Sequence, residues 1–212
     1  MPELPSEYEI GLKKGDTVST PPPNSALSRI LMTSKIPASD EIGMSDFLFP
    51  LASALRNSPT PESVCLALAE IFHVQSDEVA LLRLEQHSLR FLYPAHLRDT
   101  GAIPIFSSAI AAHTAVSKTA EIFNNFAQVK HASIFEMIAP PGTDVGEQKV
   151  PLRIQKLMSV PIIDHIQSKV LGVIQISRKG MEPQLIPDFT REEMHDVELA
   201  ADLLSKAAFW VF

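Results

Sequence analysis

Cysteine is almost absent from this sequence. The single Cys65 excludes a disulfide framework within one chain, and a structural zinc site would have to depend on histidines. The 8 glycines are scattered and form no glycine-rich phosphate loop. The G-x-S-x-G and H-E-x-x-H patterns of hydrolases are also missing. We therefore find no catalytic constellation, and we expect a non-enzymatic protein without a metal or cofactor.

Basic clusters and long apolar runs are missing too. The 18 Lys and Arg residues face 25 Asp and Glu residues, which gives a net charge of -7. A domain of this sign gains nothing from a phosphate backbone, so nucleic acid is not expected as a partner. No apolar run approaches the roughly 20 residues of a membrane span, and the N-terminus lacks the basic and apolar regions of a signal peptide. We expect a cytoplasmic protein.

Proline divides the chain into two parts. Many of its 17 prolines, among them the triplet at 21–23, lie in a polar N-terminal stretch that cannot bury enough apolar surface to offset its ordering entropy. We interpret residues 1–43 as a tail that is partly disordered, with one short helix at 26–32. Residues 44–212 form the predicted domain, with its core beginning at about residue 59.

Apolar periodicity and turn residues predict the elements of this domain. Helices are expected at 44–55, at 61–73 behind the N-cap Thr60, at 108–116, and from the capping box at Thr190 to residue 212. Strands are expected at 79–84, 89–93, 120–123, 157–163 and 169–178. In the last hairpin, Pro161 should lie at an edge or bulge, and Gly172 should let a helix or ligand approach closely, or serve packing alone.

This last hairpin carries a family resemblance. Its apolar strand with the step Val160-Pro161-Ile162, its polar turn, and the run Val170-Leu171-Gly172-Val173-Ile174 are similar to the pattern of GAF domains. The Phe189-Thr190 step before the last helix and the segment 113–125 fit the same family. The resemblance covers about 150 residues, from Pro59 to Phe212. It implies an α/β (α+β) fold with a central antiparallel sheet flanked by helices, and a sensory role.

The resemblance also brings family chemistries that this sequence does not support. Bilin-binding GAF domains attach their pigment to a cysteine in the crossover region, whereas residues 101–150 contain none. Free methionine sulfoxide reductases with this fold depend on several cysteines, and the lone Cys65 cannot run a thiol–disulfide cycle. The Asn-Lys-Phe-Asp-Glu set of cyclic-nucleotide GAF domains is missing as well.

Aromatic side chains and one histidine are the candidates for a ligand pocket. In GAF domains the crossover helix borders the pocket, and His113 lies in that helix. Aromatic walls suit a planar ligand, although the same rings could simply fill the core. The candidate residues are Phe91, Tyr93, Phe106, His113, Phe123, Phe126, Phe135 and Met158.

The last helix carries an apolar stripe that is wider than one sheet face needs. The resemblance implies a homodimer through the first and last helices, whereas the alternative is that the stripe packs only on its own sheet. The candidate dimer residues are Val197, Ala201, Leu204, Ala208 and Val211. The function we expect is a sensory module that binds a small molecule and signals through dimer helices or a separate partner protein; the alternative is a ligand-free dimerisation or scaffolding module.

Overall fold

The computed structural model describes residues 46–126 and 152–210, and the account below is confined to them. The chain divides into two units, residues 1–42 and residues 43–212, and only the second contains described residues. The N-terminal tail with its predicted helix lies outside the described residues, as do the predicted site residues Phe135 and Val211.

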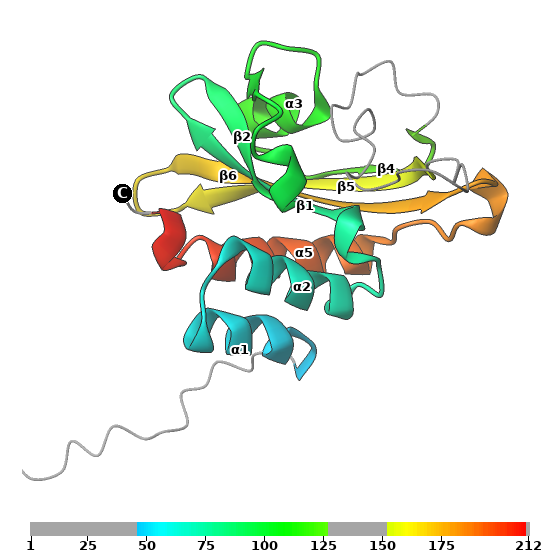
Figure 1. Ribbon diagram of the computed structural model, residues 1–212, viewed down its shortest axis with the longest axis horizontal. Helices are drawn as coiled ribbons and strands as arrows, with labels where there is room; N and C mark the ends of the chain where they lie inside the picture. Colours follow the sequence, from blue (N-terminus) through cyan, green and yellow to red (C-terminus); the bar gives the residue numbers. More distant parts are fainter. Residues whose placement is uncertain (1–45, 127–151, 211–212) are drawn as a thin grey trace, which may run out of the picture. The chain divides into compact units, whose positions relative to one another are not determined.

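An antiparallel sheet forms the centre of the second unit (Figure 1). In the described residues it has six strands, in the order β3-β2-β1-β6-β5-β4. Their bounds are Val79–Glu85 (β1), Ser88–Tyr93 (β2), Ala102–Pro104 (β3), Glu121–Phe123 (β4), Arg153–Asp164 (β5) and Lys169–Gly180 (β6). With the helices described next, this arrangement confirms the predicted fold class.

Helices cover both faces of the sheet (Figure 1). Helices α2 (Pro61–Ile71) and α5 (Arg191–Leu204) lie against one face, and α1 (Phe49–Asn57) packs on them from outside. Helix α3 (Ile110–Ser117) covers part of the opposite face. Short 3-10 helices occur at Asp46–Leu48, Ser76–Glu78, Ala95–Leu97, Pro183–Leu185 and Ala208–Trp210.

Local sequence signals determine where two of these helices begin. The side chain of Thr190 accepts a hydrogen bond from the backbone N–H of Glu193 at 3.1 Å, and the Glu193 carboxylate accepts one from the Thr190 N–H at 2.8 Å. This is the predicted capping box, and it satisfies two backbone donors that the first helical turn leaves unpaired. Thr60 caps α2 in the same way, through the backbone N–H of Ser63 at 3.1 Å.

The hairpin of β5 and β6 contains the two longest strands of the sheet. Its pairing extends from Arg153 opposite Gly180 to Asp164 opposite Lys169. Strand β4 pairs with β5 only at residues 157–159, so Pro161 lies beyond β4 at an edge of the sheet to which no other described strand pairs. A strand edge without a neighbour needs no backbone N–H donor there, which explains why proline is tolerated.

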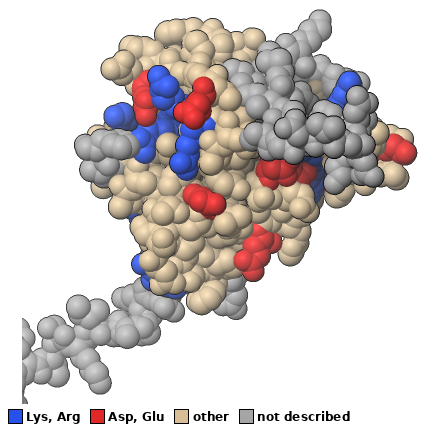
Figure 2. Space-filling model, viewed as in Figure 1, with Lys and Arg blue, Asp and Glu red and all other residues tan. Residues whose placement is uncertain are grey.

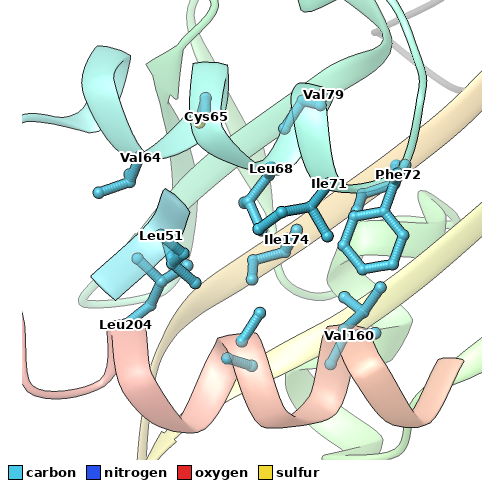
Figure 3. Close-up of a cluster of buried hydrophobic side chains, with 14 of the residues drawn as sticks. Leu51, Val64, Cys65, Leu68, Ile71, Phe72, Val79, Val160, Ile174 and Leu204 are labelled. Carbon is cyan, nitrogen blue, oxygen red and sulfur yellow. The ribbon is translucent and has the colours of Figure 1, made fainter. Parts of the chain in front are cut away.

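The larger hydrophobic core lies between the sheet and the helices α1, α2 and α5 (Figure 3). Leu51 of α1, Val64 and Leu68 of α2, Ile174 of β6 and Leu204 of α5 meet there, all fully buried. A smaller core, described below, lies on the α3 side. Most of the apolar burial that stabilises the fold therefore involves the helix layer of α2 and α5.

This core corrects the assignment of the apolar stripe on α5. Val197, Ala201 and Leu204 were predicted to meet a second chain, but their exposed fractions are 0%, 2% and 0% within a single chain. They pack on the sheet and on α1 and α2, because α5 lies flat against these elements. In the described part of the predicted dimer set, only Ala208 is exposed.

The last helix is also shorter than predicted. It ends at Leu204, and a 3-10 turn at Ala208–Trp210 follows. The apolar spacing on which the longer helix was predicted continues through these residues, so something other than the sequence pattern ends the helix.

Candidate functional site

Polar side chains interrupt the apolar face of the sheet that α3 covers. Strand pairing places Ala80 opposite Gln175, Gln175 opposite Ser159, and Ser159 opposite Glu121. These residues of β1, β6, β5 and β4 therefore form one line across the sheet. Thr114 of α3 lies over the middle of this line, and we call Thr114, Ser159 and Gln175 the polar row.

The polar row is a hydrogen-bonded network. The hydroxyl groups of Thr114 and Ser159 are 2.7 Å apart, and the Gln175 side-chain amide donates to the Ser159 hydroxyl at 3.3 Å. Thr114 also donates to the backbone carbonyl of Ile110 at 2.9 Å. All three side chains are buried. Their mutual bonds offset the desolvation that buried polar groups would otherwise suffer.

At the edge of the sheet the same line ends in a contact between a histidine and a carboxylate. Nδ1 of His113 on α3 lies 2.9 Å from Oε2 of Glu121 on β4. The two side chains are partly exposed, at 59% and 33% respectively. This pair therefore lies at the solvent-facing margin of the polar row, where it connects the middle of α3 to the start of β4.

Apolar side chains surround the polar row on the α3 side. Phe91 of β2 and Phe126 are buried there, with Leu157 of β5 and Val173 of β6, and Phe123 of β4 packs against them. The result is a mostly apolar surface with a few fixed hydrogen-bonding groups, which is the usual composition of a small-molecule site.

Comparisons with known proteins identify the family to which this fold belongs. The family model for the GAF domain matches residues 59–208. The chain belongs to the GAF family. GAF domains are small-molecule-binding sensory domains as a family. None of the curated proteins matches the chain.

Two solved GAF domains show the same fold at low sequence identity. The GAF domain of a phosphoenolpyruvate-protein phosphotransferase from Coxiella burnetii has a TM-score of 0.55 at 13% identity, over 76% of this chain and 89% of that one. The corresponding domain from Acinetobacter has a TM-score of 0.54, with the same identity and coverage. The enzyme fRMsr of Staphylococcus aureus, in its reduced form, has a TM-score of 0.48 at 17% identity, over 76% of this chain and 91% of that one.

Three of the predicted pocket residues, Phe91, Phe123 and Phe126, meet on the α3 side of this GAF domain. Phe91 and Phe126 are buried in the smaller core, and Phe123 lies at its margin. His113, the fourth predicted residue of this region, is exposed and contacts Glu121 instead of joining the buried core. The aromatic residues therefore fill the space between the sheet and α3 in this structure, as the core-filling alternative predicted.

Two other predicted pocket residues, Tyr93 and Met158, were assigned to the wrong face of the sheet. Both belong to the larger core, under α2 and α5. Tyr93 follows Phe91 by two residues, which would normally place them on one face, but a bulge opposite Leu81 and Leu82 moves Tyr93 to the other side. Met158 simply alternates with Leu157, whose side chain is the one on the α3 face.

Phe106 was also predicted wrongly. Its exposed fraction is 84%, and its ring stacks on His87 of the β1–β2 turn with 6.4 Å between the ring centres. The Pro104 carbonyl and the N–H of Ser107 form a tight turn around it, so Phe106 projects from a loop instead of entering the domain.

Sequence reasoning missed the polar row itself. A signal was available, because Ser159, Gln175 and Ser177 are polar residues within or next to the apolar central stretches of two strands. Gln175 and Ser177 follow the two-residue period of one strand face. Thr114 carried no comparable signal, since threonine is common on helix surfaces.

The one cysteine is chemically inactive in this environment. Cys65 of α2 is fully buried in the larger core. Desolvation by burial raises the pKa of the Cys65 thiol far above its ordinary value. The thiolate is the reactive form of cysteine, so the protonated Cys65 is a poor nucleophile at neutral pH.

A second polar cluster links β4 to the start of α5. The Asn124 side chain donates to the carbonyl of Phe189 at 2.9 Å and accepts from its N–H at 2.8 Å. Nζ of Lys156 donates to the Asn124 carbonyl and to the Asp188 carboxylate, each at 2.6 Å. Arg178 binds Glu193 and stacks on Phe189, 4.1 Å from the ring centre. These contacts hold the N-terminus of α5 beside the end of β4.

Two hollows in the described surface lie away from the polar row. One of about 150 Å³ is at the open edge of β5, lined by residues including Pro161, His165 and Asp202. Another, of about 350 Å³, is at the β1–β2 turn around Gln86 and His87. Within residues 46–126 and 152–210, no group of three or more His, Cys, Asp or Glu side chains is placed to hold a metal ion. In the same ranges, no helix has the length and apolar character needed to cross a membrane.

Proposed function

We propose that this chain is a non-enzymatic sensory GAF module that binds a small molecule on the α3 side of its sheet, beside the polar row. The polar row is the observation that carries the proposal. Apolar side chains would fill the centre of this face without any desolvation cost, yet three hydrogen-bonding residues lie there. Such groups can exchange their mutual bonds for bonds to a ligand and so fix its orientation.

The non-enzymatic part of the proposal is supported by the chemistry of the described residues. Cys65 is buried with a raised pKa, which argues against the thiol chemistry of GAF-fold reductases. The polar row itself consists of neutral hydroxyl and amide groups, which bind but do not readily transfer protons, and the titratable pair His113 and Glu121 lies at its partly exposed margin. The contacts between Asn124, Phe189 and Lys156 provide a route by which binding could affect α5 and thereby a second copy or a separate output protein.

Binding is tested by screening nucleotides, haem and free amino acids by native mass spectrometry and thermal shift. A ligand present at 100 times its Kd should stabilise the wild-type chain by about 2.7 kcal/mol. Gln175→Met should remove most of this stabilisation, because it deletes the amide while keeping the side-chain volume. Gln155→Met is the matched control. Gln155 of β5 is also buried, but its side-chain amide donates to the carbonyl of Gly180, the last residue of β6.

Two outcomes would contradict the proposal. If Gln175→Met and Gln155→Met respond equally to the same ligand, the binding site lies elsewhere. If no compound in the panel stabilises the wild-type chain, the alternative of a ligand-free dimerisation or scaffolding module is favoured.

We also propose that a second copy is a partner, through the outer surface of the helix layer instead of the buried stripe. Phe49 of α1 and Leu66 of α2 are 61% and 48% exposed. The lower part of the surface in Figure 2, over α1 and α2, carries few charged side chains. Exposed apolar side chains on a weakly charged surface are typical of protein contacts.

Light scattering measures this pairing directly. The wild-type chain should have twice the 23.3 kDa mass of one copy, and Leu66→Asp should shift the mass toward one copy. Leu185→Asp is the control, because Leu185 is 73% exposed but lies in the connection between β6 and α5. A wild-type mass of 23.3 kDa across the concentration range would reject the pairing.

A further inference from the structure

The chain after α5 is folded differently from what its own sequence favours. Residues 191–212 contain neither glycine nor proline, and Lys206, Ala207 and Ala208 are good helix formers. The apolar spacing of α5 continues through Ala208. Nevertheless, the helix ends at Leu204 and the chain turns into the 3-10 helix Ala208–Trp210.

The end of α5 lacks a sequence-encoded stop. Ser205 keeps right-handed helical angles, with φ -57° and ψ -22°, and its N–H still bonds the Ala201 carbonyl at 2.9 Å. The next two bonds are one residue shorter, from Lys206 to Leu203 at 3.2 Å and from Ala207 to Leu204 at 2.9 Å. Roughly a third to a half of helices end at a residue in a left-handed conformation, most often glycine and sometimes asparagine, and α5 has no such residue at this point. Here the helix only tightens, so contacts from elsewhere must hold the following residues.

Those contacts come from the sheet and from the helix itself. The guanidinium group of Arg83 on β1 donates to the Phe209 carbonyl. Nε1 of Trp210 donates to the Leu204 carbonyl at 2.6 Å, which occupies an acceptor that a longer helix would use. The Trp210 ring lies against Gly172 of β6, where a Cβ would be only 2.9 Å from the ring.

We propose that residues 205–210 form a two-position element. In the docked position, seen here, Arg83 and the surface at Gly172 hold Phe209 and Trp210 against the sheet. In the released position these contacts are broken and the residues continue α5 as a helix. The inference is independent of the proposed ligand, since it depends only on the conflict between the helix-forming sequence and the docking contacts. It identifies a conformational change that lengthens α5 and moves its C-terminal surface away from the sheet.

The experiment uses Trp210, the only tryptophan in the chain, as its probe. Arg83→Met removes the bond to the Phe209 carbonyl and keeps the aliphatic stem. Acrylamide should then quench Trp210 fluorescence at least twofold more strongly, and the circular dichroism at 222 nm should gain the helical signal of residues 205–210. Arg90→Met is the matched control, because Arg90 lies opposite Arg83 on β2 and also pairs with Glu85. It should change neither signal.

The helical nature of the released position is tested separately. Adding Lys206→Gly and Ala208→Gly to Arg83→Met should leave Trp210 accessible but abolish the gain at 222 nm. An accessible Trp210 without any gain of helix in Arg83→Met itself would mean simple fraying and would overturn the proposal. So would a Trp210 that stays protected in that variant.

A measurement on the wild-type chain covers the case in which Arg83→Met does not fold. Saturation-transfer NMR on residues 205–210 should detect a minor state with helical Cα chemical shifts. A minor state with random-coil shifts, or no exchange at these residues, would overturn the proposal.

Discussion

Substituting Gly172 by alanine should lower the free energy of unfolding by about 3 kcal/mol, near the upper end of overpacking costs. A Cβ at this position would lie 2.1 Å from the backbone carbonyl oxygen of Leu82 on the neighbouring strand. That oxygen belongs to the pairing between β1 and β6, so it cannot move without disturbing the ladder. The alanine would also press on the Trp210 ring at 2.9 Å.

Gly180→Ala is the matched control for this prediction, because Gly180 also lies in β6. The added Cβ would approach Ile186, at 2.5 Å from Cδ1, which is the end of a flexible side chain. A rotamer change can relieve that contact, so the cost should be clearly smaller than at Gly172. Urea unfolding of both variants gives the two free energies. Equal costs would show that the close approach of the Leu82 carbonyl does not limit position 172.

The sequence also predicted that Gly172 lets a helix or a ligand approach closely, or serves packing alone. In the docked position, the backbone of Leu82 and the ring of Trp210 lie against Gly172, which agrees with the packing alternative. The neighbouring Pro161 was predicted at an edge or bulge, and it lies at the edge that β4 leaves open. Both residues have backbone properties that sequence alone reveals, and for this reason their local roles could be predicted.

Other features of the fold could also be predicted, because they depend on residues close together in the sequence. The capping box of Thr190 and Glu193 and the N-cap Thr60 begin helices where they were predicted. The two apolar hairpins pair as expected from their composition. The three-residue strand β3 was missed, because Ala102–Pro104 follows a glycine and contains a proline, which together indicate a loop.

The candidate site could be predicted less well, because it depends on which face each side chain occupies. A single bulge in β2 reverses the face of Tyr93 relative to Phe91, and no residue type marks that bulge in the sequence. The polar row depends on the register between β5 and β6, which brings Ser159 opposite Gln175. It also depends on the placement of α3, a tertiary contact that has no local signal.

The apolar stripe of α5 shows the same limit on a larger scale. Spacing of three and four residues identifies a buried face correctly, but it does not say whether the covering surface is the chain itself or another copy. Here Leu51 of α1 and the sheet cover Leu204.

Leu204→Glu should leave the domain mostly unfolded, with a loss of about 5 kcal/mol or more. Burying a leucine side chain contributes about 2–3 kcal/mol, and burying an unpaired carboxyl group adds several more. Leu204 is fully buried between α1, α2 and the sheet, so the new carboxyl group has no route to solvent (Figure 3). A typical domain is stable by only about 5–15 kcal/mol, so this loss is decisive. Circular dichroism during urea unfolding measures it.

The pH dependence of this variant has a definite sign. Burial raises the pKa of the introduced carboxyl group in the folded state above its unfolded value of about 4.3. The unfolded state therefore releases its proton first as the pH rises, and the variant loses stability between that pH and the higher folded pKa. Relative to the wild-type chain, Leu204→Glu should be less destabilised at pH 5 than at pH 8.

Leu199→Glu separates burial within the chain from burial between copies. Leu199 lies on the same helix but is 37% exposed, so this variant should change the stability by no more than about 0.5 kcal/mol. If the stripe containing Leu204 instead faced a second copy, Leu204→Glu would give a folded monomer with a normal circular dichroism spectrum. That result would contradict the packing of α5 described here, whereas an unfolded Leu204→Glu beside a folded Leu199→Glu assigns the stripe to the core of the single chain.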